Sequence, residues 1–187
     1  MSERDIMWTP TTGVGLEHLR LSQDFAGYVA SSVIIGMDDG RPFSAWYGIH
    51  CDANSRVRLV NIHMLQDGQK RIELQADGEA HWQSPSGEPL TVLDGCIDVD
   101  ISATPFTNTL PIRRLALNPG QSAELLVAYI ALPKMEVQPD RQRYTCLEVS
   151  ADGGLYRYES LSSDFTRDIR VDADGLVVDY PGLFKRV

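Results

Sequence analysis

The sequence predicts an all-β protein, mainly antiparallel and with little helix. Apolar and polar residues alternate with a period of two along much of the chain. Turn-forming sequences such as MDDGRP, SPSGEP and NPGQ separate the apolar runs, roughly every ten residues. A period of two is typical of strands, and Asp-Gly favours tight hairpins. We therefore expect about a dozen short strands joined by tight turns.

Residues 43–51 form the clearest predicted strand. Its apolar face consists of Phe43, Ala45, Tyr47, Ile49 and Cys51. Residues 97–103 and 123–131 alternate in the same way, 111–117 (PIRRLAL) favour a helical turn, and QPDR at 138–141 is typical of a turn. A sheet of this length must curl or close to hide its edges, so we expect a curled sheet with a concave face or a cavity.

Length and charge limit the possible partners. The 187 residues suit one domain covering 1–187. Seventeen basic against twenty-six acidic residues give a net charge of -9, which disfavours nucleic acid. No apolar run approaches the roughly 18 residues of a membrane span, and the first residues lack a signal-peptide pattern, so we expect a cytoplasmic protein without a membrane span. Cys51, Cys96 and Cys146 lie in apolar stretches and are expected to be reduced and buried.

Motifs of catalysis and of cofactor binding do not occur in the sequence. The four histidines show no pair at metal-binding spacing. GVGLEH at 13–18 lacks the third glycine of a dinucleotide fingerprint, and neither a GxSxG elbow nor a phosphate-binding loop is present. The sequence therefore predicts no catalytic residue, no metal ligand and no cofactor, and it favours a binding protein over an enzyme.

The segment DGCIDVDISATPFTNTLPIRRL, residues 94–115, concentrates polar side chains in an apolar frame. Because side chains alternate along a strand, Asp98 and Asp100 share a polar face, and Ile97, Val99 and Ile101 face the core. Further along, Phe106 lies among threonines, an asparagine and arginines, a combination suited to a polyhydroxylated ligand. The alternative is a solvated strand face followed by a turn that its own side chains cap.

Four stretches distributed over the chain carry a family resemblance. They are YGIHCD (47–52), the 94–115 segment, ALPKMEVQPDRQRY (131–144) and GLVVDYPGLFKRV (175–187). The chain resembles the bacterial proteins described as putative glycolipid-binding proteins. This resemblance implies a spiral β-roll, similar in shape to lipoprotein carrier proteins that hold acyl chains in a half-open roll. Through the shared motif it also implies a set of ligand-binding residues: Asp98, Asp100, Thr104, Phe106, Thr107, Asn108 and Arg113.

Three hypotheses of function follow. The first is a protein that binds a glycolipid or another amphiphile, with the acyl chain inside the curled sheet and the polar head near residues 98–113. The second is an enzyme acting on a carbohydrate or a lipid, with Asp98 and Asp100 as its acids. The third is a protein-interaction module that uses an exposed sheet edge, for example as a homodimer.

Overall fold

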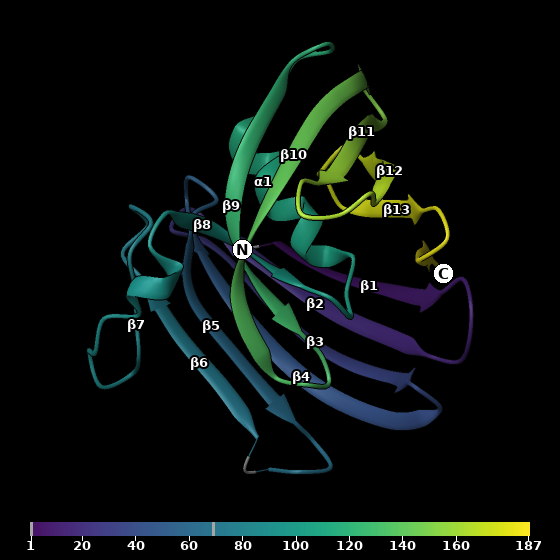
Figure 1. The fold of residues 1–187 in the computed structure, drawn as a ribbon. Coiled ribbons are helices and arrows are strands. Elements are labelled where there is room, and N and C mark those ends of the chain that lie inside the picture. The colour runs from purple at the N-terminus through teal and green to yellow at the C-terminus, as the bar shows by residue number, and fades with distance from the viewer. Residues whose placement is uncertain (1, 69) are drawn as a thin grey trace.

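The structure is a computed structural model that describes residues 2–68 and 70–187. The strands are β1 (Ser2–Pro10), β2 (Leu16–Asp24), β3 (Gly27–Asp38), β4 (Arg41–Asp52), β5 (Val57–Met64), β6 (Arg71–Ala76), β7 (Trp82–Gln83), β8 (Cys96–Ile101), β9 (Ser122–Ala131), β10 (Glu136–Ser150), β11 (Gly153–Ser160), β12 (Thr166–Asp172), β13 (Val177–Tyr180) and β14 (Phe184–Arg186). The helical segments are η1 (Thr91–Leu93), η2 (Phe106–Asn108) and α1 (Thr109–Leu115). The prediction of an all-β fold with little helix is confirmed (Figure 1).

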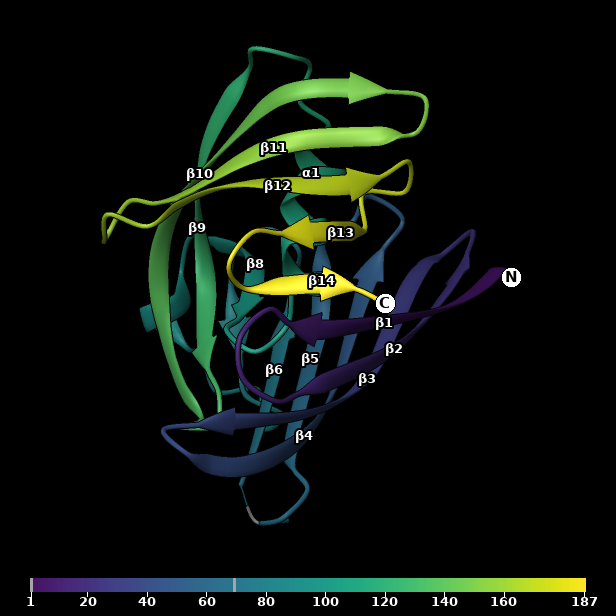
Figure 2. The ribbon, with the colours of Figure 1, turned by 90° about the vertical axis from the view of Figure 1, so that its right-hand side faces the viewer.

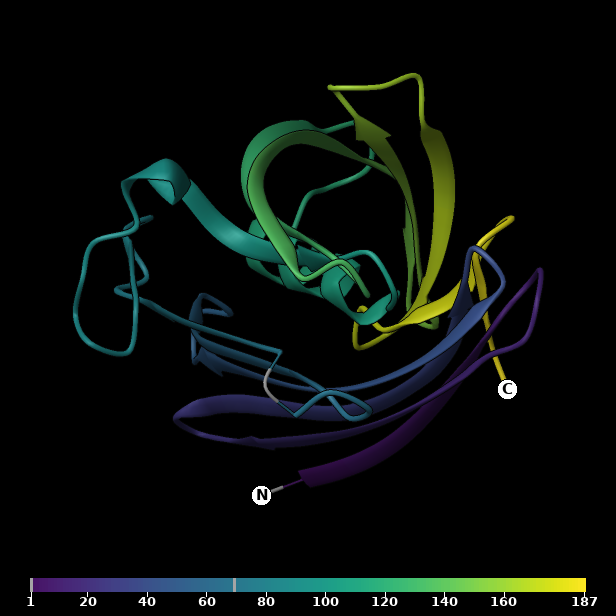
Figure 3. The same ribbon diagram turned by 60° about the horizontal axis from the view of Figure 1, so that its bottom comes forward.

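All described strands belong to one curled sheet. Its order is β7-β6-β5-β4-β3-β2-β1-β14-β13-β12-β11-β10-β9-β8, so the first and last strands of the chain lie side by side at its middle (Figure 2). Every pair is antiparallel except β8 and β9. A parallel pair needs a crossover connection, and η2 and α1 lie within it. Figure 3 shows that the sheet curls around this crossover, so the predicted spiral roll is confirmed.

The roll is not closed between its two edge strands. Within the described residues β7 and β8 do not pair with each other. The indole Nε1 of Trp82 on β7 instead donates to the carbonyl oxygen of Cys96 on β8 at 2.7 Å. A second bond runs from the Gly95 amide to the Ala80 carbonyl oxygen at 2.9 Å. Two hydrogen bonds thus hold the edges near each other, and the sheet remains an open roll.

Strand periodicity places the core as the sequence predicts. In β4 the side chains of Phe43, Ala45, Tyr47, Ile49 and Cys51 are all buried. A smaller aromatic cluster lies between α1 and β10–β13, where Tyr158 packs against Tyr144 and Tyr180. The three cysteines are free and buried, which confirms that prediction.

The sequence predictions for 111–117 and 138–141 had different outcomes. The first lies largely within α1 and is confirmed as helical. The turn predicted at 138–141 is wrong, because these residues belong to β10 and the hairpin turn lies before Glu136. Pro139 pairs with Ala128 of β9, and pairing with β11 begins only at Gln142. A proline is tolerated in this part of β10 because the strand has a neighbour on one side only.

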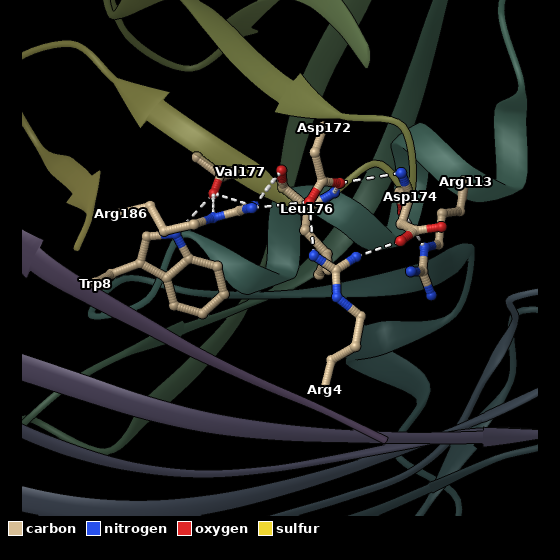
Figure 4. Close-up of polar contacts among 8 residues, drawn as sticks. All are labelled: Arg4, Trp8, Arg113, Asp172, Asp174, Leu176, Val177 and Arg186. Carbon is tan, nitrogen blue, oxygen red and sulfur yellow. Dashed lines mark hydrogen bonds and ion pairs between the residues drawn. The ribbon is translucent and has the colours of Figure 1, made fainter. Parts of the chain in front are cut away.

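A half-buried aspartate, Asp172, joins β1 to the C-terminal strands. Asp172 accepts hydrogen bonds from Arg4 at 3.1 Å and from Arg186 at 2.8 Å (Figure 4). It also accepts the backbone N–H of Leu176, while the indole of Trp8 donates to the Val177 carbonyl oxygen. Burial opposes ionisation of Asp172, but these donors hold its pKa below the usual value. The network anchors the middle of the sheet.

Asp172→Asn is expected to lower the free energy of unfolding at neutral pH by about 1–2 kcal/mol, because two charge-assisted hydrogen bonds lose their charged acceptor. The folded-state pKa of Asp172 is depressed, so its contribution is present above the unfolded value of 3.8 and is lost as the pH falls through the folded value. Urea unfolding at pH 7 and pH 3 measures this. Asp174→Asn, at an exposed site that Arg4 also contacts, should change stability by less than about 0.5 kcal/mol. Equal losses from both variants would contradict the prediction.

No helix among residues 2–68 and 70–187 combines the length and the apolar character that crossing a membrane requires.

Candidate ligand-binding site

The predicted polar face of β8 is buried instead of solvated. Asp98 is fully buried, and the Arg114 guanidinium of α1 covers it, with Nη2 at 2.6 Å from Oδ2 and Nε at 3.1 Å from Oδ1. The interpretation of this face as a solvated one is therefore wrong. The crossover that joins β8 to β9 folds back over this face, and on the other face Val99 and Ile101 belong to the main core. Asp98 has a structural partner and lines none of the cavities described below.

Asp100 lies on the same face of β8 in a different environment. Its carboxylate accepts hydrogen bonds from the Thr107 hydroxyl at 3.0 Å and from the Gln142 amide at 2.7 Å. Burial raises the pKa of Asp100, and these two hydrogen bonds only partly oppose it. The same Gln142 amide lies 3.2 Å from Asp140, so one neutral donor bridges two carboxylates. Because Asp98 is buried under Arg114, Asp98 and Asp100 do not form a pair in one cavity.

The other residues of the predicted set are dispersed. Phe106 is buried and stacks on Tyr47, with ring centroids 6.4 Å apart. Asn108 is buried and accepts a hydrogen bond from the Tyr144 hydroxyl at 2.9 Å. The Nε of Arg113 donates to the Asp174 carbonyl oxygen in the β12–β13 turn (Figure 4). The Arg113 guanidinium also covers the Tyr28 ring. The predicted set is thus not one surface.

An apolar cavity of about 420 Å³ opens where the β1–β2, β3–β4 and β9–β10 turns gather. Its apolar lining residues include Trp8, Ile34, Phe43, Ala131 and Leu132. At its mouth Val14, Leu16, Ile35 and Met37 are exposed to solvent. Its volume lies within the range of small-molecule pockets. We call this space the apolar cavity.

A second cavity of about 340 Å³ lies next to it, and we call it the polar cavity. Carboxylate, amide and hydroxyl groups line most of it: Asp100, Thr104, Asn108, Gln138, Asp140, Ser160, Ser162, Ser163, Tyr158 and Tyr180. Ser102, Tyr129 and Phe184 line both cavities. The two spaces are therefore adjacent, share a wall and differ in chemical character.

A buried carboxyl group connects the two cavities, and we call its residues the Glu17 cluster: Glu17, Ser32, Tyr47 and Thr104. Glu17 lines the apolar cavity, and Thr104 lines the polar cavity. Oε1 of Glu17 accepts the hydroxyls of Ser32, Tyr47 and Thr104 at 2.8, 2.7 and 2.9 Å. Oε2 is buried and has no hydrogen-bond partner among the described residues. Burial raises the pKa of Glu17 to about 7, although the three hydroxyls oppose the shift.

The sequence analysis missed Glu17, although β2 carries a signal for it. Glu17 alternates with Leu19 and Leu21, and all three are buried. An acid on the apolar face of a predicted strand is unusual, because ionisable groups are rarely buried without a partner. Among the predicted residues, Asp100, Thr104 and Asn108 reach the polar cavity. Within the described residues no group of three His, Cys, Asp or Glu side chains could hold a metal ion.

Comparison with known protein families identifies a matching family. The model of the family described as "Putative glycolipid-binding" matches residues 5–186. The chain belongs to this family. The match includes every strand that lines the two cavities, so the family relation concerns the roll as a whole. Among curated proteins none matches.

Two crystal structures have a similar fold. A DUF1089 family protein from Pseudomonas aeruginosa is 40% identical with a TM-score of 0.83, and the alignment covers 96% of this chain and 95% of that one. A β-barrel-like protein of the domain of unknown function DUF1849 from Brucella abortus is 11% identical, with a TM-score of 0.55 and coverage of 99% and 95%. The second likeness shows only that the folds agree.

Proposed function

We propose that the protein binds a glycolipid or a similar neutral amphiphile, with its acyl chain in the apolar cavity and its polar head in the polar cavity. The observation that carries this proposal is the position of the two cavities, which are adjacent and share Ser102, Tyr129 and Phe184 as a wall. Apolar side chains are the more numerous in the lining of the first, and polar side chains in the lining of the second. The description of the family supports the same class of ligand.

The acyl chain is the main source of affinity in this arrangement. Burying about eight methylenes at about 0.8 kcal/mol each contributes roughly 6 kcal/mol. Each hydrogen bond to the head contributes only about 1 kcal/mol net, because it replaces a bond to water. The apolar cavity therefore supplies affinity, and the polar cavity selects among heads.

The polar cavity favours a neutral head over an anionic one. Asp100 and Asp140 both line it, and a negatively charged head would meet two acidic side chains. Its serine hydroxyls and the amide of Gln138 can bond to sugar hydroxyls, while the rings of Tyr158 and Phe165 can cover the C–H face of a sugar. These groups fit an uncharged, polyhydroxylated head.

Ala131→Phe is expected to weaken binding of decyl β-glucoside at least about tenfold, because the larger ring occupies space in the apolar cavity that the chain needs. Isothermal titration calorimetry below the critical micelle concentration measures the dissociation constant. The matched control is Ala123→Phe, on the same strand but lining neither cavity, which should leave the affinity unchanged.

Decyl sulfate serves as a second probe in the same assay. It has an equal chain and an anionic head, and the wild type should bind it more weakly than decyl β-glucoside. Equal losses from the two phenylalanine variants, or the absence of binding to the wild type, would overturn the proposed function.

A further inference from the structure

The carboxyl group of Glu17 lies at the boundary between the two cavities. Glu17 lines the apolar cavity, and the hydroxyl that it binds, on Thr104, lines the polar cavity. An amphiphile that occupies both cavities places the junction between its chain and its head near this boundary. Glu17 is thus positioned beside the linkage group of the ligand.

The two oxygens of this carboxyl group are unequal. Three hydroxyl donors within 2.9 Å already occupy Oε1. Oε2 has no partner in the described part of the chain, although Glu17 is only 3% exposed. Buried polar atoms almost always have a hydrogen-bond partner, and leaving one without a partner is costly. Side chains at a binding site commonly adjust their rotamers when the ligand enters, which would give a ligand access to Oε2. A donor on the ligand would then satisfy this oxygen.

We propose that Oε2 of Glu17 selects amphiphiles that carry an N–H or O–H donor at the junction of chain and head, as an N-acyl amide or a hydroxyl beside the linkage does. This inference rests on the proposed function and names the class of ligand within it. Selection by such a group is strong, because an analogue without the donor leaves the buried oxygen unpaired. The three hydroxyls of the Glu17 cluster hold the carboxyl group in place, so the ligand need not order it.

Two glucamides test the inference, because they differ only at the junction. N-decanoylglucamine has an amide N–H between its chain and its head, and N-decanoyl-N-methylglucamine has a methyl group in that place. At pH 8, where the carboxylate form of Glu17 predominates, the wild type is expected to bind the first at least about tenfold more tightly. Calorimetry below the critical micelle concentrations measures both constants.

The variant Glu17→Gln distinguishes a hydrogen bond to Oε2 from a steric effect of the ligand's methyl group. The amide oxygen of glutamine can accept the same three hydroxyls, and its NH₂ group in place of Oε2 cannot accept an N–H. In Glu17→Gln, the affinities for N-decanoylglucamine and N-decanoyl-N-methylglucamine should differ by no more than about twofold, and the N-methyl ligand should still bind. Glu3→Gln, at an exposed site on β1, removes the same charge and should retain the preference.

The outcomes distinguish the two proposals. Equal binding of both glucamides by the wild type would overturn this inference and leave the proposed function standing. A preference that persists in Glu17→Gln would be a steric effect of the methyl group and would also overturn it. Binding of neither glucamide by the wild type would overturn the proposed function and this inference with it.

Discussion

Replacing Arg114 by methionine is expected to lower the free energy of unfolding by about 3–5 kcal/mol, because the substitution leaves Asp98 buried without its partner. The Arg114 guanidinium makes three contacts of 2.6–3.2 Å with the carboxylate, and Asp98 is 0% exposed. Methionine retains most of the packing volume of arginine, so the loss of stability is due chiefly to the unpaired charge of Asp98. Urea unfolding at pH 7 measures it.

The neighbouring Arg113 provides a matched control on the same helix. Its guanidinium covers Tyr28 and donates one bond to a carbonyl oxygen, so Arg113→Met should cost about 1 kcal/mol or less. The double variant Asp98→Leu, Arg114→Met should recover most of the loss, because it removes both charges. A single Arg114 variant as stable as the Arg113 variant would show that the buried ion pair is not important for folding.

The stability lost in Arg114→Met should also depend on pH. Burial raises the pKa of Asp98 even in the wild type, where Arg114 opposes the shift, so without the guanidinium the folded-state pKa rises further. The penalty is then present at neutral pH and decreases as the pH falls and Asp98 takes up a proton. A constant loss between pH 7 and pH 4 would argue for a packing defect instead.

Strand periodicity predicted the fold well because most strands have one face toward the core. In β4 every second residue from Phe43 to Cys51 is buried, so the binary pattern alone identifies the strand and its inner face. The same reasoning gives the curled sheet, since a sheet of this length must hide its edges. The turn at QPDR was mispredicted because local turn propensity cannot show that Pro139 lies where β10 has one neighbour only.

The site was less predictable because β8 is covered on both faces. Alternation correctly put Asp98 and Asp100 on one side, but only the tertiary structure shows that α1 and Gln142 of β10 cover that side. Polar residues that bind one another inside a protein look, in sequence, like polar residues that bind a ligand. The cavities themselves arise from turns far apart in the chain, which no local pattern can bring together.

Glu17→Gln is expected to make the protein more stable than the wild type at pH 8 by about 3 kcal/mol, and by much less at pH 4. The folded-state pKa of about 7 lies above the usual value of 4.5, so the stability that Glu17 contributes is present in full below 4.5 and is lost as the pH rises through 7. At about 1.4 kcal/mol per pH unit, this interval corresponds to about 3 kcal/mol. Chemical unfolding of both proteins at half-unit steps of pH measures the difference.

The comparison of two proteins isolates Glu17 from the other acids. Burial also raises the pKa of Asp100, so the stability of the wild type alone would combine several titrations. Glutamine mimics the neutral carboxyl group and retains an acceptor for the three hydroxyls, so the difference between the proteins follows the ionisation of Glu17. Glu3→Gln, which removes the same charge at an exposed site of β1, is the control for the change in net charge. A flat difference for Glu17→Gln would mean that Glu17 ionises in the folded protein as it does in the unfolded chain, despite its burial between the two cavities.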